Sequence, residues 1–203
     1  MEVLTREVPP DRLRTHPLHS ALRPRAAVLC LLLAALAARA ARAQPPPSTE
    51  YEVKAAFLYN FAKFVEWPAD AFADSRSHFV IGIVGSDPFG PGIDRALSNK
   101  VVHGRDLDVR RFPDAPPASG CHLLFFSQAD STTLRRNLQS VAGSTVLTVG
   151  EASTFLDLGG TIRFVLESNK VRFDIDVASA EAARLRISSK LLRLARVLRG
   201  VRP

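Results

Sequence analysis

The sequence predicts an α/β fold: a mixed sheet with a mainly parallel βαβ part, a C-terminal β-hairpin and a closing amphipathic helix. Short apolar strands alternate with helical segments between residues 79 and 149, which favours parallel strands joined by crossover helices. Two runs of alternating apolar and polar residues then flank a short turn at Ser168–Lys170, as in a hairpin. Residues 179–199 have the apolar spacing of a helix.

The N-terminal segment, residues 1–43, has the pattern of a secretory signal peptide. Arg23 and Arg25 precede the apolar run 26–38, and Ala41-Arg42-Ala43 places small residues around a cleavage site. The apolar run is too short for a membrane span, which needs about 20 residues. We therefore expect export to the periplasm with cleavage before Gln44. An uncleaved N-terminal membrane anchor is the alternative.

The chain that remains after cleavage consists of a Pro-rich spacer, residues 44–50, and one α/β domain, residues 51–203. The full sequence has 27 basic and 20 acidic residues, of which residues 1–43 hold seven and three, so the remainder has a net charge of +3. This small net charge is not the footprint of nucleic-acid binding, which needs a concentrated basic face, so we expect no nucleic-acid partner. The remaining length is sufficient for one domain with a hydrophobic core.

The first helix of the domain is expected to begin near Glu50, with Ser48 or Thr49 as its N-cap, and to end at Pro68. Its apolar face contains Phe57, Leu58, Phe61, Phe64 and Val65. Tyr59 and Trp67 project away from this face and are therefore our candidates for contact with a partner; packing against a neighbouring loop is the alternative. Lys54 projects onto the apolar face, where it is expected to extend its amine past the first turn. The alternative is a charge with a specific partner.

The parallel part of the sheet is expected to contain four strands: Phe79–Val84, Leu107–Phe112, Cys121–Phe126 and Thr145–Val149. Helices are expected at Ile93–Leu97 and Ser131–Val141. The first of the strands is almost continuously apolar, which is typical of a strand buried on both faces. The loop after it, Gly85–Gly92, has no phosphate-binding signature, so we expect a tight turn, with an anion site as the alternative.

The hairpin has one register in which apolar residues face apolar residues and opposite charges face each other, if Ser168–Asn169 is a two-residue turn. In this register the facing pairs are Leu166 and Val171, Phe164 and Phe173, Ile162 and Ile175, Arg163 and Asp174, and Glu167 and Lys170. After the hairpin, the helix 179–199 is expected to pack its leucine-rich face on the sheet and to leave its basic face in solvent. Association with a membrane surface is the alternative.

A catalytic centre is not visible in the sequence, and we expect neither enzymatic activity nor a cofactor. Cys121 and His122 are neighbours in a strand, so their side chains point to opposite faces and cannot share a metal ion. Once Cys30 leaves with the signal peptide, Cys121 is the remaining cysteine and cannot form an intramolecular disulfide. We expect a buried, unreactive thiol, with a reactive thiol or an intermolecular disulfide as the alternatives.

Several motifs follow one another along the whole predicted domain. The most specific are Lys54-Ala-Ala-Phe57 with Trp67-Pro68 at the start and Leu191-Leu-Arg-Leu-Ala195 at the end. Between them lie Gly85-Ser-Asp-Pro-Phe89, Cys121-His-Leu-Leu-Phe-Phe-Ser127, Leu147-Thr-Val149 and Phe155–Gly160. With these motifs the chain resembles the YfiR-like family of bacterial periplasmic regulators.

The resemblance implies an α/β domain that is often dimeric and has no catalytic residues. It also implies a regulator that binds the extracytoplasmic part of a membrane signalling protein, a diguanylate cyclase or a sensor kinase, and holds it inactive. The chain departs from the family pattern at Asp176, where Asn is expected, and its single Cys121 cannot supply the disulfides of the characterised type. The alternative function is a periplasmic small-molecule-binding module that uses the strand ends near Gly85 and Ser127.

Overall fold

The structure is a computed structural model that describes residues 47–117 and 119–200. The predicted signal peptide, residues 1–43, lies outside these residues. The helices are α2 (Pro47–Phe64), the 3-10 helix η1 (Ala69–Ala71), α3 (Pro91–Leu97), α4 (Ser131–Ser140), α5 (Val177–Ala182) and α6 (Ser189–Leu192). Within the two described ranges, none of the helices combines the length and the apolar composition that crossing a membrane requires.

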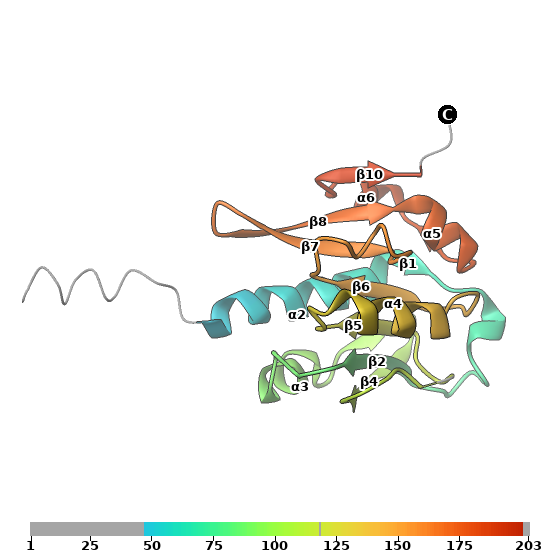
Figure 1. Cartoon of the computed structure of the whole chain (residues 1–203). Helices are drawn as coiled ribbons and strands as arrows, with labels where there is room; N and C mark the ends of the chain where they lie inside the picture. Colours follow the sequence, from blue (N-terminus) through green and yellow to red (C-terminus); the bar gives the residue numbers. More distant parts are fainter. Residues whose placement is uncertain (1–46, 118, 201–203) are drawn as a thin grey trace, which may run out of the picture. The chain divides into compact units, whose positions relative to one another are not determined.

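Ten strands complete the described domain. They are β1 (Val65–Glu66), β2 (Phe79–Val84), β3 (Val101–Val102), β4 (Arg105–Phe112), β5 (Leu123–Phe126), β6 (Leu147–Gly150), β7 (Ile162–Glu167), β8 (Lys170–Asp176), β9 (Arg186–Ile187) and β10 (Val197–Arg199). Eight form one sheet in the order β10-β8-β7-β6-β5-β2-β4-β3, whose strands from β10 to β4 are labelled in Figure 1. Strand β1 pairs with β9 in a separate small sheet. The predicted α/β class with a mixed sheet is confirmed.

The centre of the large sheet is parallel, as the alternation of strands and helices predicts. Strand β2 pairs in parallel with β4 on one side and with β5 on the other, and β6 and β7 continue the parallel order. All six residues of β2 are buried, which confirms a strand covered on both faces. Its odd-numbered residues pack in a cluster with α2 and α3, whereas Val80 and Val84 pack in a second cluster with α4. The helices therefore cover both faces of the sheet (Figure 1).

The hairpin of β7 and β8 has the predicted register at every pair, including Arg163 opposite Asp174. Ser168 and Asn169 form its turn with φ angles of 49° and 59°. Positive φ at both central residues is the geometry of a type I′ turn, which matches the twist of the flanking strands. Phe164 and Phe173 face α2, where Phe61 lies 5.6 Å and 5.0 Å from them between ring centroids.

The expected closing helix, residues 179–199, is wrong in its extent, because the segment divides into α5, β9, α6 and β10. Arg184 ends α5 with a φ of 59°, and hydrogen bonds run from Leu185 N to Ala180 O and from Arg184 N to Glu181 O. This is the Schellman arrangement, which usually has glycine at the left-handed position. Ser188 then caps α6 through its side chain, and β10 adds a parallel edge strand to β8.

The first helix also differs from its predicted limits. It begins at Pro47, so Ser48 and Thr49 lie inside α2 and not at its N-cap, and part of the predicted spacer 44–50 is helical. It ends at Phe64, before Pro68, because Val65 and Glu66 pair with β9 in an antiparallel ladder. Trp67 consequently lies beyond the helix and not on its outer face.

We expect Gly150→Ala to destabilise the domain, because the ring of the fully buried Phe155 leaves no space for a side chain at this position. A methyl group at residue 150 would lie 2.3 Å from this ring. Such overpacking costs about 1–3 kcal/mol of the free energy of unfolding, which urea titration measures. Gly92→Ala is the matched control, since nothing lies within 4 Å of the added atom, and it should leave stability unchanged or slightly raised. Equal stabilities for the two variants would contradict this packing.

Candidate functional site

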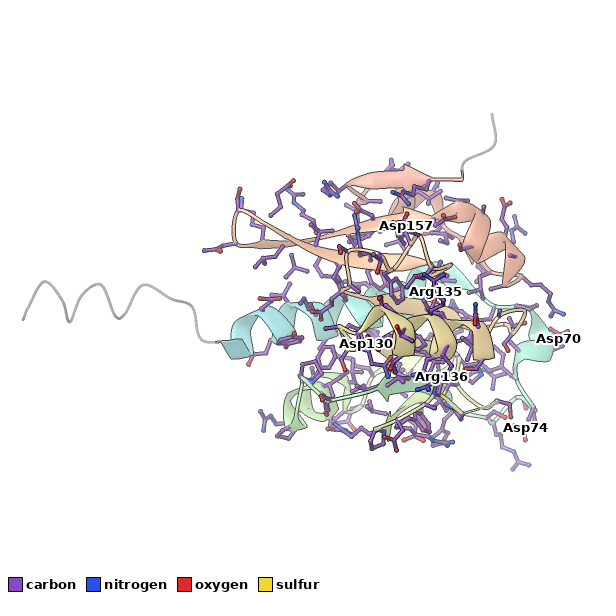
Figure 2. All side chains as sticks on the ribbon, in the orientation of Figure 1. Asp70, Asp74, Asp130, Arg135, Arg136 and Asp157 are labelled. Carbon is purple, nitrogen blue, oxygen red and sulfur yellow. The ribbon has the colours of Figure 1, made fainter. Side chains whose placement is uncertain are left out.

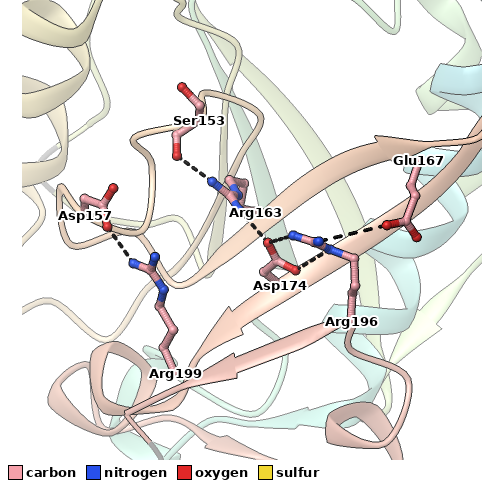
Figure 3. A network of polar contacts seen from close by, with 7 residues as sticks. All are labelled: Ser153, Asp157, Arg163, Glu167, Asp174, Arg196 and Arg199. Carbon is pink, nitrogen blue, oxygen red and sulfur yellow. Dashed lines mark hydrogen bonds and ion pairs between the residues drawn. The ribbon is translucent and has the colours of Figure 1, made fainter.

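The carboxylate of Asp174 is the centre of a buried polar network (Figure 3). Its side chain is 1% exposed, and Arg163 Nη2 donates to Asp174 Oδ2 at 2.6 Å. Arg196 approaches from the segment before β10, with its Nε at 2.9 Å from Oδ1 and its Nη2 at 2.8 Å from Oδ2. The cross-strand pair predicted from the sequence is therefore an ion pair that a second arginine completes.

The network connects three segments that are distant in the sequence. Arg163 also donates to the carbonyl of Ser153 in the loop after β6, and Arg199 of β10 pairs with Asp157 in the same loop (Figure 3). Burial would raise the pKa of Asp174, but hydrogen bonds from Arg196 and Arg163 outweigh it, so this pKa lies below its ordinary value. Asp174 is therefore an ionised structural group with no proton to donate at neutral pH.

Lys54 is the centre of a second buried cluster. Its side chain is 5% exposed, and its amine pairs with Glu50 one turn earlier in α2 and, at 3.1 Å, with Glu151 after β6. The amine also lies 4.4 Å from the centre of the Tyr51 ring. The expectation that Lys54 extends past the first turn to solvent is wrong, and the alternative of a specifically partnered charge is confirmed.

Tyr51 completes this cluster as a hydrogen-bond donor. Its hydroxyl donates to Glu151 Oε2 at 3.3 Å. Burial, and then the negative charges of Glu151 and Glu50, raise the pKa of Tyr51 to about 12. The phenol therefore keeps its proton at neutral pH.

The carboxyl ends of β2 and β5 border an open hollow of about 560 Å³. Beside the hollow, the chain passes from β2 to α3 on one face of the sheet and from β5 to α4 on the other face. Open α/β sheets bind ligands where neighbouring strands connect to opposite faces in this way. The lining of the hollow includes Gly85, Ser127 and Gln128. Arg136 of α4, which Figure 2 labels, also lines it. Gln128 Oε1 is buried without a hydrogen-bond partner among the described residues. The hollow could therefore accept a polar ligand with a donor group.

The Gly85–Gly92 loop is a tight turn rather than an anion site. Gly85 has a φ of 95°, and a side chain there would meet Ser127 Oγ at 2.7 Å. The carboxylate of Asp87 accepts hydrogen bonds from the amides of Phe89 and Gly90 at 2.8 Å and 3.1 Å. These amides are consequently not free to bind a phosphate, and the predicted tight turn is confirmed.

The two predicted contact residues, Tyr59 and Trp67, both lie near β3, Tyr59 beside Val101 and Trp67 beside His103. Tyr59 is half-buried on the outer side of α2, and its hydroxyl donates to the carbonyl of Val101 at 3.3 Å. Trp67 packs edge-on against Phe79 at 4.8 Å, lies 6.5 Å from the ring of His103, and donates from Nε1 to the carbonyl of His122 at 3.3 Å. Both side chains thus have internal contacts and a partly exposed surface.

Cys121 and His122 lie at the start of β5 and are both buried. Burial raises the pKa of the Cys121 thiol to about 11. His122 Nδ1 accepts from the amide of Val80 at 3.0 Å, while Nε2 lies 3.2 Å from the carbonyl of Ala71, and burial lowers the pKa of this imidazole. Both residues are structural here. Among residues 47–117 and 119–200, no three His, Cys, Asp or Glu side chains form a group that could hold a metal ion.

Asp174→Asn should destabilise the domain by about 2–3 kcal/mol, because it leaves Arg163 and Arg196 without their shared charge. Chemical unfolding at pH 7 measures this loss. Asp157→Asn, which removes the partner of Arg199 in an exposed ion pair, should have little effect. Because the folded pKa of Asp174 is lowered, its contribution is present above the unfolded pKa near about 4 and lost as the pH falls through the folded value. A loss for Asp174→Asn that does not shrink below pH 4 would contradict this assignment.

Cys121 should react slowly with a thiol reagent at pH 8 while the protein is folded, since its thiol is buried and its pKa is raised. The same protein in concentrated urea should react within the dead time of manual mixing, which controls for the reagent. Equal rates in the two states would show that the thiol is accessible.

The model of the YfiR/HmsC-like family matches residues 51–196, which is more than half of the chain and nearly the whole described domain. No curated protein matches the sequence. The family is known for periplasmic regulation and is not a catalytic family. This protein therefore belongs to the YfiR/HmsC-like family.

Proposed function

We propose that this protein is an exported, non-enzymatic regulator that binds the extracytoplasmic part of a membrane signalling protein and holds it inactive. The observation that supports this most is the family match over residues 51–196. The buried ionisable groups also support a non-enzymatic function, because Asp174 and Lys54 are both held in ion pairs within the domain. The partner we propose is a diguanylate cyclase or a sensor kinase.

Inhibition by contact requires that the regulator binds one state of its partner better than the other. A ligand shifts a two-state equilibrium only by its difference in affinity for the two states. A rigid binding surface favours such selectivity, and α2 is rigidly held by the buried Phe61 and by Lys54. We propose Tyr59 and Trp67 as contact residues, with Tyr59 the better target for mutation because Trp67 also packs against Phe79. A homodimer is part of the same proposal.

Export is the first requirement of this function. We propose that residues 1–43 are removed as a signal peptide and that the protein works in the periplasm from Gln44 onward. Mass spectrometry of the protein from the periplasmic fraction should therefore give the mass of a chain that begins at Gln44, with this residue either free or cyclised to pyroglutamate. Recovery of an intact N-terminus from the membrane fraction would instead support the uncleaved anchor.

Deletion of the gene in the native host should raise the cyclic dinucleotide level and surface attachment, if the partner is a diguanylate cyclase that this protein restrains. Expression of the wild-type chain from a plasmid should reverse both changes. A sensor kinase partner would instead appear as increased phosphorylation of its response regulator. Unchanged cyclic dinucleotide level, attachment and phosphorylation would exclude the regulatory function.

The hollow beside Gly85, Ser127 and Gln128 supports a second candidate function, a periplasmic small-molecule-binding module. Its position at the ends of β2 and β5 and the unpartnered Gln128 Oε1 favour this alternative. A ligand that binds the folded protein raises its melting temperature by an amount that grows with the ligand concentration. Stabilisation by a compound that Gln128→Ala abolishes, together with an unchanged phenotype on deletion, would favour the module over the regulator.

A further inference from the structure

Hydrogen bonds on both ring nitrogens of His122 fix one protonation state of this buried side chain. The backbone amide of Val80 donates to Nδ1 at 3.0 Å, so Nδ1 carries no proton. The carbonyl of Ala71 can only accept a hydrogen bond, so Nε2, at 3.2 Å from it, is the nitrogen that carries the proton. The folded domain therefore holds a neutral imidazole in a single tautomer. A second proton, on Nδ1, would point at the Val80 amide and break this hydrogen bond.

His122 also connects the sheet to residues 67–78, which we call the η1 segment. None of the residues of this segment is buried. The bond from Nε2 reaches the helix η1, and the ring of Phe72 stacks on the His122 ring at 4.4 Å between ring centroids. Trp67, at the start of the segment, donates to the carbonyl of His122. Because segments with few buried side chains open at a lower free energy than the core, the η1 segment can separate while the sheet stays folded.

Arg105 of β4 is the charged side chain that acts on the His122 ring. Its guanidinium carbon lies 3.9 Å from the centre of the Phe72 ring, and Nη1 donates to the carbonyls of Asp74 and Ser77 at 2.8 Å. A positive charge at this position opposes a second positive charge on the imidazole. Burial, and to a smaller extent the charge of Arg105, lowers the pKa of His122, while the hydrogen bond to the carbonyl in η1 partly offsets these effects.

The acidic groups of the η1 segment are engaged elsewhere. Asp70 and Asp74 lie in this segment (Figure 2), but Asp70 pairs with an arginine that follows α5, and Asp74 accepts hydrogen bonds from its own turn. Glu66, just before the segment, and His78, at its end, are exposed. Strands β2 and β6, on either side of β5, contain no ionisable residue. A protonated His122 ring is therefore better accommodated in solvent than at its place in the fold.

We propose that His122 is an acid-sensitive switch, in which protonation of the ring releases the η1 segment, with Trp67, from a sheet that stays folded. Strand β5 remains paired with β2 and β6 in the released state, because these backbone ladders do not involve the His122 side chain. The released state binds one proton more than the closed state. Its population therefore rises as the pH falls below the ordinary imidazole value of about 6.5, by up to about tenfold per pH unit, and levels off below the lowered pKa of the closed state.

The switch places partner binding under the control of periplasmic pH. This consequence rests on the proposed function, because Trp67 is one of the proposed contact residues. The closed segment holds the Trp67 ring edge-on against Phe79, at 4.8 Å between ring centroids. Release removes this fixed geometry, so we expect acid to weaken the inhibition of the membrane signalling protein.

Hydrogen–deuterium exchange of the full chain, expressed and purified from the native host, measures the release. Protection factors, which correct for the pH dependence of the exchange chemistry, are compared at pH 7.5, 6.5 and 5.5, on both sides of the ordinary imidazole pKa of about 6.5. In peptides from the η1 segment they should fall by up to about tenfold per pH unit as the ring is protonated, whereas β6 should keep its protection. Trp67 is the single tryptophan of the sequence, so its fluorescence should shift to longer wavelength over the same range.

His122→Asn is the test variant, since its Oδ1 takes the place of Nδ1 as the acceptor for the Val80 amide and cannot become charged. Its protection factors should not change with pH. His78→Asn combined with His103→Asn is the matched control, because both of these histidines are exposed, and it should respond to pH like wild type. If His122→Asn does not fold, the nitrogen chemical shifts of the wild-type imidazole replace it. Nδ1 should then be unprotonated at neutral pH and should gain its proton at the midpoint of release.

Equal protection of the η1 segment at every pH, or the same pH dependence in wild type and His122→Asn, would overturn the switch. A parallel loss of protection in β6 would overturn it as well, because it indicates global unfolding. In the deletion strain, the signalling output that responds to deletion should rise in acid medium with the wild-type chain but not with His122→Asn. An equal output with both chains, despite release in the purified protein, would overturn the control of the partner through Trp67. No phenotype on deletion would exclude the proposed function alone, since exchange decides the switch.

Discussion

The packing of Phe61 against Phe164 and Phe173 is the interaction on which the rest of the structure depends. Phe61 is fully buried, and its contacts join the first helix of the domain to a hairpin about a hundred residues later in the chain. Burial of an aromatic side chain of this size contributes about 1.5–3 kcal/mol, and aromatic pairs add a further fraction. Once this face of α2 is fixed, helical geometry directs Tyr59 and Lys63 to the opposite side. The core therefore determines which side chains remain available to a partner.

Lys54 shows how the same helix accommodates a charge inside its apolar face. Burial of an unpaired ammonium group would cost several kcal/mol, so its position requires compensation. Glu50 supplies one carboxylate from the preceding turn, and Glu151 supplies the other from the end of β6. The pairing with Glu151 fixes α2 against the parallel strands, while the Asp174 network fixes β10 and the loop after β6 against the hairpin. Two separate ionic contacts thus join these segments in addition to the apolar core.

The parts of the fold that depend on neighbouring residues could be predicted from the sequence. The apolar run of β2, the alternation of strands and helices, and the register of the β7–β8 hairpin all follow from local patterns. The end of α5 could not be predicted, because Arg184 adopts the left-handed conformation that a glycine would have signalled. The helical spacing of apolar residues also continues through α6, so the segment resembles one long helix. Trp67 was misplaced because α2 ends through pairing with β9, which lies about 120 residues later. Glu151, which pairs with Lys54, is also distant from it in the sequence. Ser188 is a capping signal for α6, but the apolar periodicity of the segment obscures it.

The distribution of charge within the domain explains why a contact function is more consistent with this structure than catalysis. The buried ionisable groups Asp174 and Lys54 are paired, and Tyr51 retains its proton because its pKa is raised to about 12. A catalytic acid or base needs a pKa near the working pH, together with access to the substrate. Asp174 and Lys54 lack that access, because their side chains are 1% and 5% exposed and are engaged with oppositely charged partners.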